Sequence, residues 1–210
     1  AECGHLDVIE YLVSKGADVN TTNALGESPL SIAARGEFFS AQMLLLHGAK
    51  INLVDDRGYT PLQHAILRDQ VNVATLLIKH GAYLHSYCSK TESPLQISCT
   101  ISNPRLVLCL LNAGCELGKE KWFNAKVIQE KLSELDFQWS KHFHRLANAQ
   151  KDLWHTVMMK ISKPHSLMES CRVSIRCQLL YASNGKSILS RVGKLPLPKT
   201  LIKYVSLEDA

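Results

Sequence analysis

Gly58-Tyr59-Thr60-Pro61-Leu62-Gln63-His64-Ala65 is the segment from which the fold can be inferred. Threonine before proline supplies a side-chain oxygen for the unpaired amides of a first helical turn, and proline fits that turn because its missing N–H leaves no hydrogen bond unmade. A helix is therefore predicted to begin at Pro61. Ser28-Pro29-Leu30 and Ser93-Pro94-Leu95 repeat the pattern at spacings of 32 and 33 residues, so helices are also predicted from Pro29 and Pro94.

A second landmark, a glycine, keeps the same period. Gly16, Gly48, Gly81 and Gly114 are spaced by 32, 33 and 33 residues, and each follows an apolar segment. Glycine adopts the left-handed conformation that ends many helices, so each is predicted to end the second helix of a unit. The turn-rich stretches at 23–26 and 55–58 are predicted to project as hairpin tips. Two landmarks in register indicate an array of helix-turn-helix repeats.

The stretch 58–65 resembles the ankyrin-repeat signature Gly-x-Thr-Pro-Leu-x-x-Ala, which residues 26–33 follow closely and residues 91–98 more loosely. The resemblance implies an all-α fold, a solenoid of helix-turn-helix repeats with short hairpin loops. Residues 1–20 supply only the second helix of a unit, so the array is expected to begin on an exposed apolar face. A longer intact protein, a short isoform and a fragment all remain open, because repeat arrays need capping units.

Composition limits the classes of function. The chain has 210 residues, 46% of them hydrophobic, and no apolar run approaches the roughly 20 residues that cross a bilayer. Seven scattered cysteines lack the spacing of a zinc site or disulfide framework, which favours a reducing location in the cytoplasm or nucleus. Residues 1–118 carry 8 Lys and Arg against 11 Asp and Glu, and residues 119–210 carry 16 against 8. The basic charges never form a block, so neither nucleic acid nor membrane is an expected partner.

The domain organisation is predicted in three parts. Residues 1–118 form the repeats, 119–163 an irregular helical cap or linker, and 164–210 a C-terminal helical module. The aromatic residues of the middle part are expected to pack between the repeats and that module, with an aromatic ligand cage as the less favoured alternative.

In the C-terminal module, Ser166 and Glu169 form a capping box, and four residues follow at intervals of four along one helical face: Leu167, Cys171, Ile175 and Leu179. Residues 166–175 resemble the elongin-binding half of a SOCS box, and residues 192–205, which contain Leu195-Pro196-Leu197-Pro198, resemble its cullin-binding half. Both halves occur in the expected order. The chain is thus similar to the ankyrin repeat and SOCS box family.

The resemblance implies specific contacts. Leu167 would insert into elongin C, Cys171 would permit close approach, and Ile175 and Leu179 would extend the contact. Leu195, Pro196, Leu197 and Pro198 would face cullin-5. These residues could alternatively be the core of a helical cap and a plain connecting turn.

No phosphate-binding loop, nucleophile elbow or metal-binding helix motif occurs, so no catalytic residue, metal or cofactor is expected. Cys171 is expected to be an inert interface thiol. Asn20 occupies the hairpin position that an asparaginyl hydroxylase modifies in many ankyrin proteins, with an ordinary turn-stabilising asparagine as the alternative.

The predicted function is that of a substrate-recognition adaptor of a ubiquitin ligase, made with elongins B and C, cullin-5 and its RING protein. A protein substrate would bind the concave surface and hairpin tips, at Leu25, Asp55, Asp56, Arg57 and Lys90. The rival is an ankyrin scaffold that recruits no ligase. The sequence names neither the substrate nor the family member, because ankyrin specificity depends on surface residues whose partner is encoded elsewhere.

Overall fold

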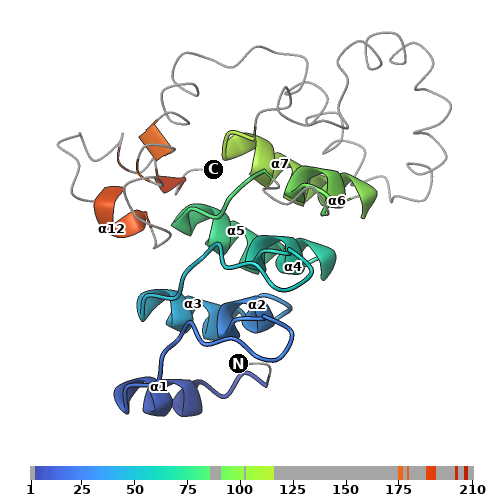
Figure 1. Ribbon diagram of the computed structural model, residues 1–210. Coiled ribbons are helices and arrows are strands. Elements are labelled where there is room, and N and C mark those ends of the chain that lie inside the picture. Colours follow the sequence, from blue (N-terminus) through green and yellow to red (C-terminus); the bar gives the residue numbers. More distant parts are fainter. Residues whose placement is uncertain are drawn as a thin grey trace, which may run out of the picture.

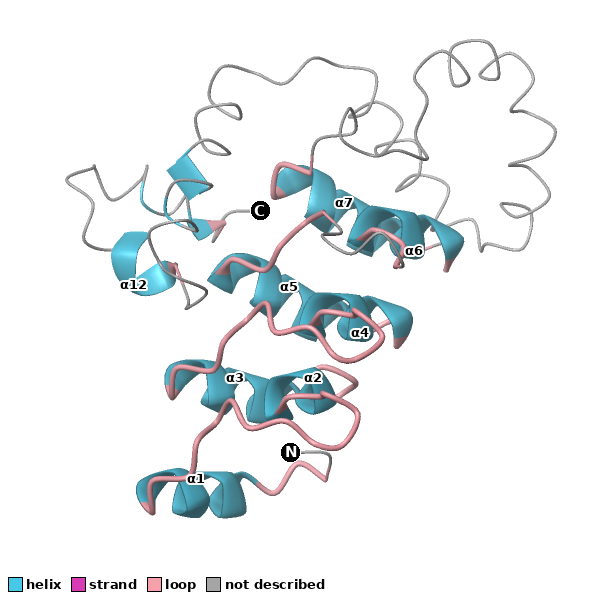
Figure 2. Ribbon diagram, viewed as in Figure 1, coloured by secondary structure: helices cyan, strands magenta, loops and turns pink. Residues whose placement is uncertain are grey.

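The computed structural model describes residues 3–85, 91–101 and 103–115, and in the C-terminal part residues 175, 176, 179, 188–192, 202, 206 and 207. The linker predicted at 119–163, and most of the predicted C-terminal module, lie outside these residues. Within the described residues every regular element is a helix (Figure 2).

Within the described part of the repeats, three helix pairs follow one another. They are α2 (Pro29–Ala33) with α3 (Phe38–Leu46), α4 (Pro61–Leu67) with α5 (Val71–His80), and α6 (Pro94–Thr100) with α7 (Pro104–Asn112). The first helices stack in one column and the second helices in another, where α1 (Leu6–Ser14) packs on α3 (Figure 1). The short helix α12 (Leu189–Val192) belongs to the C-terminal module. The all-α repeat fold predicted from the sequence is confirmed.

The predicted helix starts are confirmed at all three prolines. Pro29, Pro61 and Pro94 each occupy the first turn, and the preceding Ser28, Thr60 and Ser93 accept a hydrogen bond from the backbone N–H three residues on. At Thr60 the bond is reciprocated, since the Gln63 side chain accepts from the Thr60 N–H at 2.8 Å. Such caps satisfy amides that the helix itself leaves unpaired.

The predicted ends of the second helices are also confirmed. Gly81 follows α5 with φ 103°, in the left-handed region. Gly16, Gly48 and Gly114 adopt the same conformation after α1, α3 and α7. A side chain at these positions would be strained, which explains why the glycine recurs with the period of the fold.

Asparagines join successive repeats at the hairpin base. The Asn20 side-chain oxygen accepts from the Lys50 N–H at 2.7 Å, and the Asn52 oxygen accepts from the Tyr83 N–H at 2.8 Å. Each bond crosses from one repeat to the next, so the two asparagines hold the spacing of the stack. Hydroxylation of Asn20 stays a prediction.

The core lies between the helix columns and runs through the stack. Its fully buried side chains include Leu30, Leu62, Ile66, Leu77 and Leu110. By contrast, α1 leaves Val8, Tyr11 and Leu12 about half exposed or more, at 48%, 61% and 50%. None of the described helices has the length and apolar character to span a membrane.

Candidate protein-binding surface

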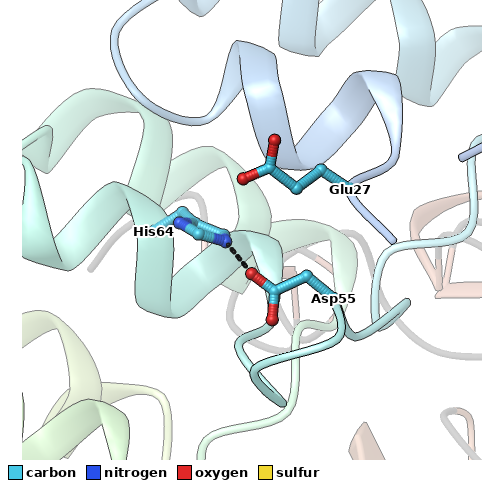
Figure 3. A group of neighbouring side chains, drawn as sticks. All are labelled: Glu27, Asp55 and His64. Carbon is cyan, nitrogen blue, oxygen red and sulfur yellow. Dashed lines mark hydrogen bonds and ion pairs between the residues drawn. The ribbon is translucent and has the colours of Figure 1, made fainter. Parts of the chain in front are cut away.

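A buried aspartate fixes the hairpin that precedes α4. One oxygen of Asp55 accepts from the backbone N–H groups of Arg57 and Tyr59, at 3.0 and 2.8 Å. The other lies 2.9 Å from His64 Nε2, which points back from α4 (Figure 3). Asp55 is only 6% exposed. The loop is thereby tied to the helix that follows it.

A second buried carboxylate, Glu27, fixes the preceding hairpin. One of its oxygens forms an ion pair with Arg35, and the other accepts from the Asn23 side-chain amide at 3.0 Å. The Asn23 bond is the main cause of a lowered pKa for the Glu27 carboxyl; Arg35 lowers the pKa further, and burial opposes both. Asn23 in turn accepts from the Leu25 and Glu27 amides, so this hairpin too is held by side chains of its own repeat.

Glu27, Asp55 and His64 come close enough to suggest a metal site, with one potential ligand atom from each lying within 4.8 Å of the others (Figure 3). Their hydrogen bonds supply a different account. Both carboxylates have both oxygens engaged by protein donors, and His64 donates to Asp55. Buried polar groups that satisfy one another in this way brace a structure without requiring an ion.

Between the two hairpins and the ends of α2 and α4 lies a groove of about 380 Å³. Glu27 and His64 form its buried floor, and Tyr59 packs beside His64 with 5.8 Å between ring centroids. Its rim carries exposed side chains from both repeats. These are Leu25, Arg57, Leu67 and Arg68.

The structure places the predicted substrate-binding residues unequally. Leu25, Asp56 and Arg57 are exposed on the hairpins, where they are available to a partner. The prediction that Asp55 contacts a substrate is corrected by the structure. Its buried carboxylate is used entirely by the loop and His64, so it shapes the surface and is not free to contact a partner. Lys90 lies outside the described residues. Binding by the three exposed residues stays a prediction.

Sequence reasoning missed Tyr59, Leu67 and Arg68 as groove residues. Leu67 and Arg68 come at the end of a helix whose other residues are buried, and Leu67 is nevertheless 45% exposed. An apolar residue at the end of an apolar helix gives no sequence signal of exposure.

The C-terminal module has a small apolar cluster of its own. Ile188 and Val192 are buried, and Ile175, Leu179 and Ile202 pack against them while staying partly exposed. Ile175 and Leu179, two of the predicted elongin contacts, therefore also join the two halves of the module. Leu167, Cys171 and the four predicted cullin contacts, Leu195 to Pro198, lie outside the described residues.

The module docks on the repeat stack at the end of α5. Arg176, which is 5% exposed, donates from Nη2 to the Ile78 carbonyl at 2.6 Å. The Ile188 N–H donates to the His80 carbonyl at 2.9 Å, and Leu207 joins the main core. The last carbonyls of a helix have no partner within it, so the module supplies a donor to the His80 carbonyl and a second donor to the Ile78 carbonyl, which also accepts from the Gly81 N–H.

Two histidines make stability depend on pH. Burial lowers the pKa of His64, although its bond to Asp55 acts in the opposite direction, and burial also lowers the pKa of His80. Below about pH 6.5 these two histidines bind protons more readily in the unfolded chain than in the folded chain. The free energy of unfolding therefore decreases as pH falls through that value. We expect the free energy of unfolding, measured in urea, to decrease from about pH 7.5 to pH 5.5.

The His64→Gln variant tests the share that belongs to His64, because glutamine keeps a side-chain N–H donor and does not titrate. The variant is expected to lose less stability than the parent chain over the same pH range. Glu27 does not contribute to the change in stability over this pH range, because its lowered pKa affects stability only below the usual value of 4.5. Equal pH dependence in both proteins would contradict the assignment.

Comparison with known sequences agrees with this architecture. The family described as "Ankyrin repeats (3 copies)" matches residues 1–87 and 36–121, and the SOCS box family matches residues 163–206. The Neurospora crassa protein "Ankyrin repeat protein nuc-2" is 32% identical over 116 residues, which are 54% of this chain and 11% of that protein. Human "Ankyrin repeat and SOCS box protein 16" is 27% identical over 96 residues, 45% of this chain and 21% of that protein.

A further relative is the rat "Cyclin-dependent kinase 4 inhibitor B", 33% identical over 79 residues, 38% of this chain and 60% of that protein. In each of these comparisons the chain spans less than two thirds of the relative's length. The stacked helix pairs with their hairpins define an ankyrin-repeat protein, and the repeat match covers more than half of the chain. With a SOCS box after the repeats, the chain belongs to the ankyrin repeat and SOCS box family.

Proposed function

We propose that this protein is a substrate-recognition adaptor of a cullin-RING ubiquitin ligase. The observation that carries the proposal is the presence, on one chain, of a repeat stack with a formed groove and a SOCS box that docks against the same stack. The first holds a protein substrate, and the second recruits elongins B and C with the cullin. The adaptor acts in the cytoplasm or the nucleus.

The adaptor performs no reaction itself. A substrate bound to the repeats is held near the conjugating enzyme that the RING protein carries, and the effective concentration of its lysines there is raised. The bonds from Arg176 and Ile188 to the end of α5 support this role, because they fix the recruiting module relative to the repeats. A fixed geometry limits which substrate lysines come within reach.

The finer part of the proposal is that the cullin is cullin-5, contacted by Leu195, Pro196, Leu197 and Pro198. Two prolines hold such a segment in few conformations, so little ordering is required on binding. We expect the complex of this chain with elongins B and C to co-elute with cullin-5 in size exclusion, and not with another cullin. Replacing Leu195 and Leu197 by alanine is expected to weaken cullin binding by about tenfold or more.

The matched control for the cullin experiment replaces Leu25 and Leu67, two exposed leucines of the repeats, by alanine. This variant should bind cullin-5 as the parent does. Retention of elongins B and C by the Leu195 and Leu197 variant would show that its module is folded. Preferential binding of a cullin other than cullin-5 would contradict the cullin-5 assignment. Binding of no cullin would contradict the ligase role.

A scaffold that recruits no ligase is the second candidate. The packing of Arg176, Ile188 and Leu207 on the stack favours it as well, since a module that only capped the repeats would bury the same residues. The two candidates differ in whether the module also binds elongins.

A further inference from the structure

The residues that line the groove between the first two hairpins include more arginines than acidic residues. Three arginines line it, and Arg35 is paired with Glu27 on the floor. Within the part of the chain that the structure describes, Arg57 and Arg68 form no ion pair. Both are exposed on the rim. The groove therefore offers two guanidinium groups to an incoming ligand.

None of the neighbouring acids forms an ion pair with these two arginines in the described residues, although hydrogen bonds from neutral groups leave the carboxylate charges in place. Both oxygens of Asp55 are engaged beneath the rim by the loop amides and His64. Asp69, next to Arg68 in sequence, accepts a hydrogen bond from Asn103 of the following repeat. Asp56 is exposed but lies beyond ion-pair distance of Arg57. His64 adds no charge near neutral pH, because burial lowers its pKa.

The same rim carries two exposed leucines. Leu25, on the first hairpin, is 51% exposed, and Leu67, at the end of α4, is 45% exposed. Tyr59 lies between the repeats and is partly buried. Leucines beside arginines provide apolar contact and charge together, and such a combination suits a peptide better than a phosphate alone.

We infer that this groove binds a peptide segment of a protein in which an apolar side chain is flanked by aspartate or glutamate. The apolar side chain contacts Leu25 and Leu67, and the acidic side chains pair with Arg57 and Arg68. Arginine is suited to this role because its planar guanidinium binds a carboxylate through two parallel hydrogen bonds. Nucleic acid fits less well, since the rim offers leucines where stacked bases require aromatic faces. The inference rests on the proposed function in that the bound protein would be the ligase substrate.

The test measures fluorescence anisotropy of a short labelled peptide in which leucines alternate with pairs of glutamates, added to the full chain. We expect binding that weakens as salt is raised, because exposed charge pairs are screened. The Arg57→Glu and Arg68→Glu double variant is expected to raise the Kd about tenfold or more. The matched control is Arg105→Glu, another exposed arginine, located on α7 and outside the groove lining. It should leave the Kd within about twofold.

Two further probes decide the chemistry of the ligand. Replacing glutamate by lysine in the peptide should abolish binding, and the Leu25→Ala and Leu67→Ala variant should weaken binding of the glutamate peptide. Equal binding by the parent and the charge-reversed variant would overturn the inference. Equal binding of the lysine peptide would also overturn it. So would displacement of the labelled glutamate peptide by single-stranded RNA at a lower concentration than the unlabelled glutamate peptide requires.

Elongin binding separates this inference from the proposed function. The Arg57→Glu and Arg68→Glu variant should still co-purify with elongins B and C, because both residues lie on the repeats. Failure of the peptide to bind, with elongin binding intact, overturns only the acidic-peptide inference. Peptide binding by a chain that never recruits elongins would leave the groove assignment in place and remove the ligase role.

Discussion

Replacement of Arg176 by alanine is expected to lower the free energy of unfolding by about 2 kcal/mol and the Tm by about 4–8 °C. The guanidinium is buried and donates to the Ile78 carbonyl near the end of α5. Its loss removes a charge-assisted hydrogen bond and the packing of a long side chain. It also removes a positive charge from the negative end of the helix. Thermal unfolding monitored by circular dichroism measures the change.

Arg105→Ala is the matched control, because Arg105 is an exposed arginine whose loss should change the free energy of unfolding by less than about 0.5 kcal/mol. Amide exchange locates the effect. The Ile188 N–H, which donates to His80, should exchange faster in the Arg176 variant than in the parent chain. An unchanged Tm together with unchanged exchange at Ile188 would contradict the docking of the module on α5.

The repeat fold could be predicted in detail from local sequence. A Ser or Thr before proline determines where α2, α4 and α6 begin, and the glycine after α5 is needed for a φ of 103°. Each of these signals acts through neighbours in the chain, so it does not depend on knowing the tertiary structure. The period of the landmarks then predicts the stacking.

The groove could be predicted only in part. The turn-rich stretches correctly indicated the hairpins, and Leu25 and Arg57 are exposed there. Asp55 was misassigned because a loop aspartate is usually solvated, whereas this one is covered by His64 from the following helix. Leu67 and Arg68 join the groove only when two repeats are stacked. Such neighbours are set by packing between repeats, which the local pattern does not encode.

The hydrogen bonds that dock the C-terminal module on the repeats could not be predicted either. Arg176 follows Ile175 in a helical stretch and would ordinarily be placed in solvent. It is buried where it donates to the carbonyl of Ile78, 98 residues earlier in the chain, which also accepts from the Gly81 N–H. No local feature of the sequence links the two residues.

Replacement of Leu167 and Cys171 by alanine is expected to weaken elongin binding by about 30-fold or more, which corresponds to about 2 kcal/mol. A leucine enclosed in a partner's pocket loses most of its apolar contact when it is truncated. A small thiol at the interface would permit close approach of the partner, and alanine is also small, so most of the expected loss comes from Leu167. Both roles are implied by the resemblance to the elongin-binding half of the SOCS box.

Matched changes on the repeats provide the control for this variant. Leu46→Ala with Cys3→Ala alters the same residue types at exposed positions, where Leu46 is 76% exposed, and should leave elongin binding unchanged. The control separates loss of the interface from general effects of truncation. Thermal unfolding of both variants shows whether either one has lost its fold.

Co-expression of the full chain with elongins B and C, followed by size exclusion, tests the adaptor role most directly. The parent chain and the Leu46 and Cys3 control should elute as a ternary complex with both elongins, and the Leu167 and Cys171 variant should elute without them. If the parent chain elutes without elongins, or if the Leu167 and Cys171 variant retains them as the parent does, the assigned recruiting site is contradicted. Absence of any complex with the parent chain would leave an ankyrin scaffold whose C-terminal module only caps the repeats.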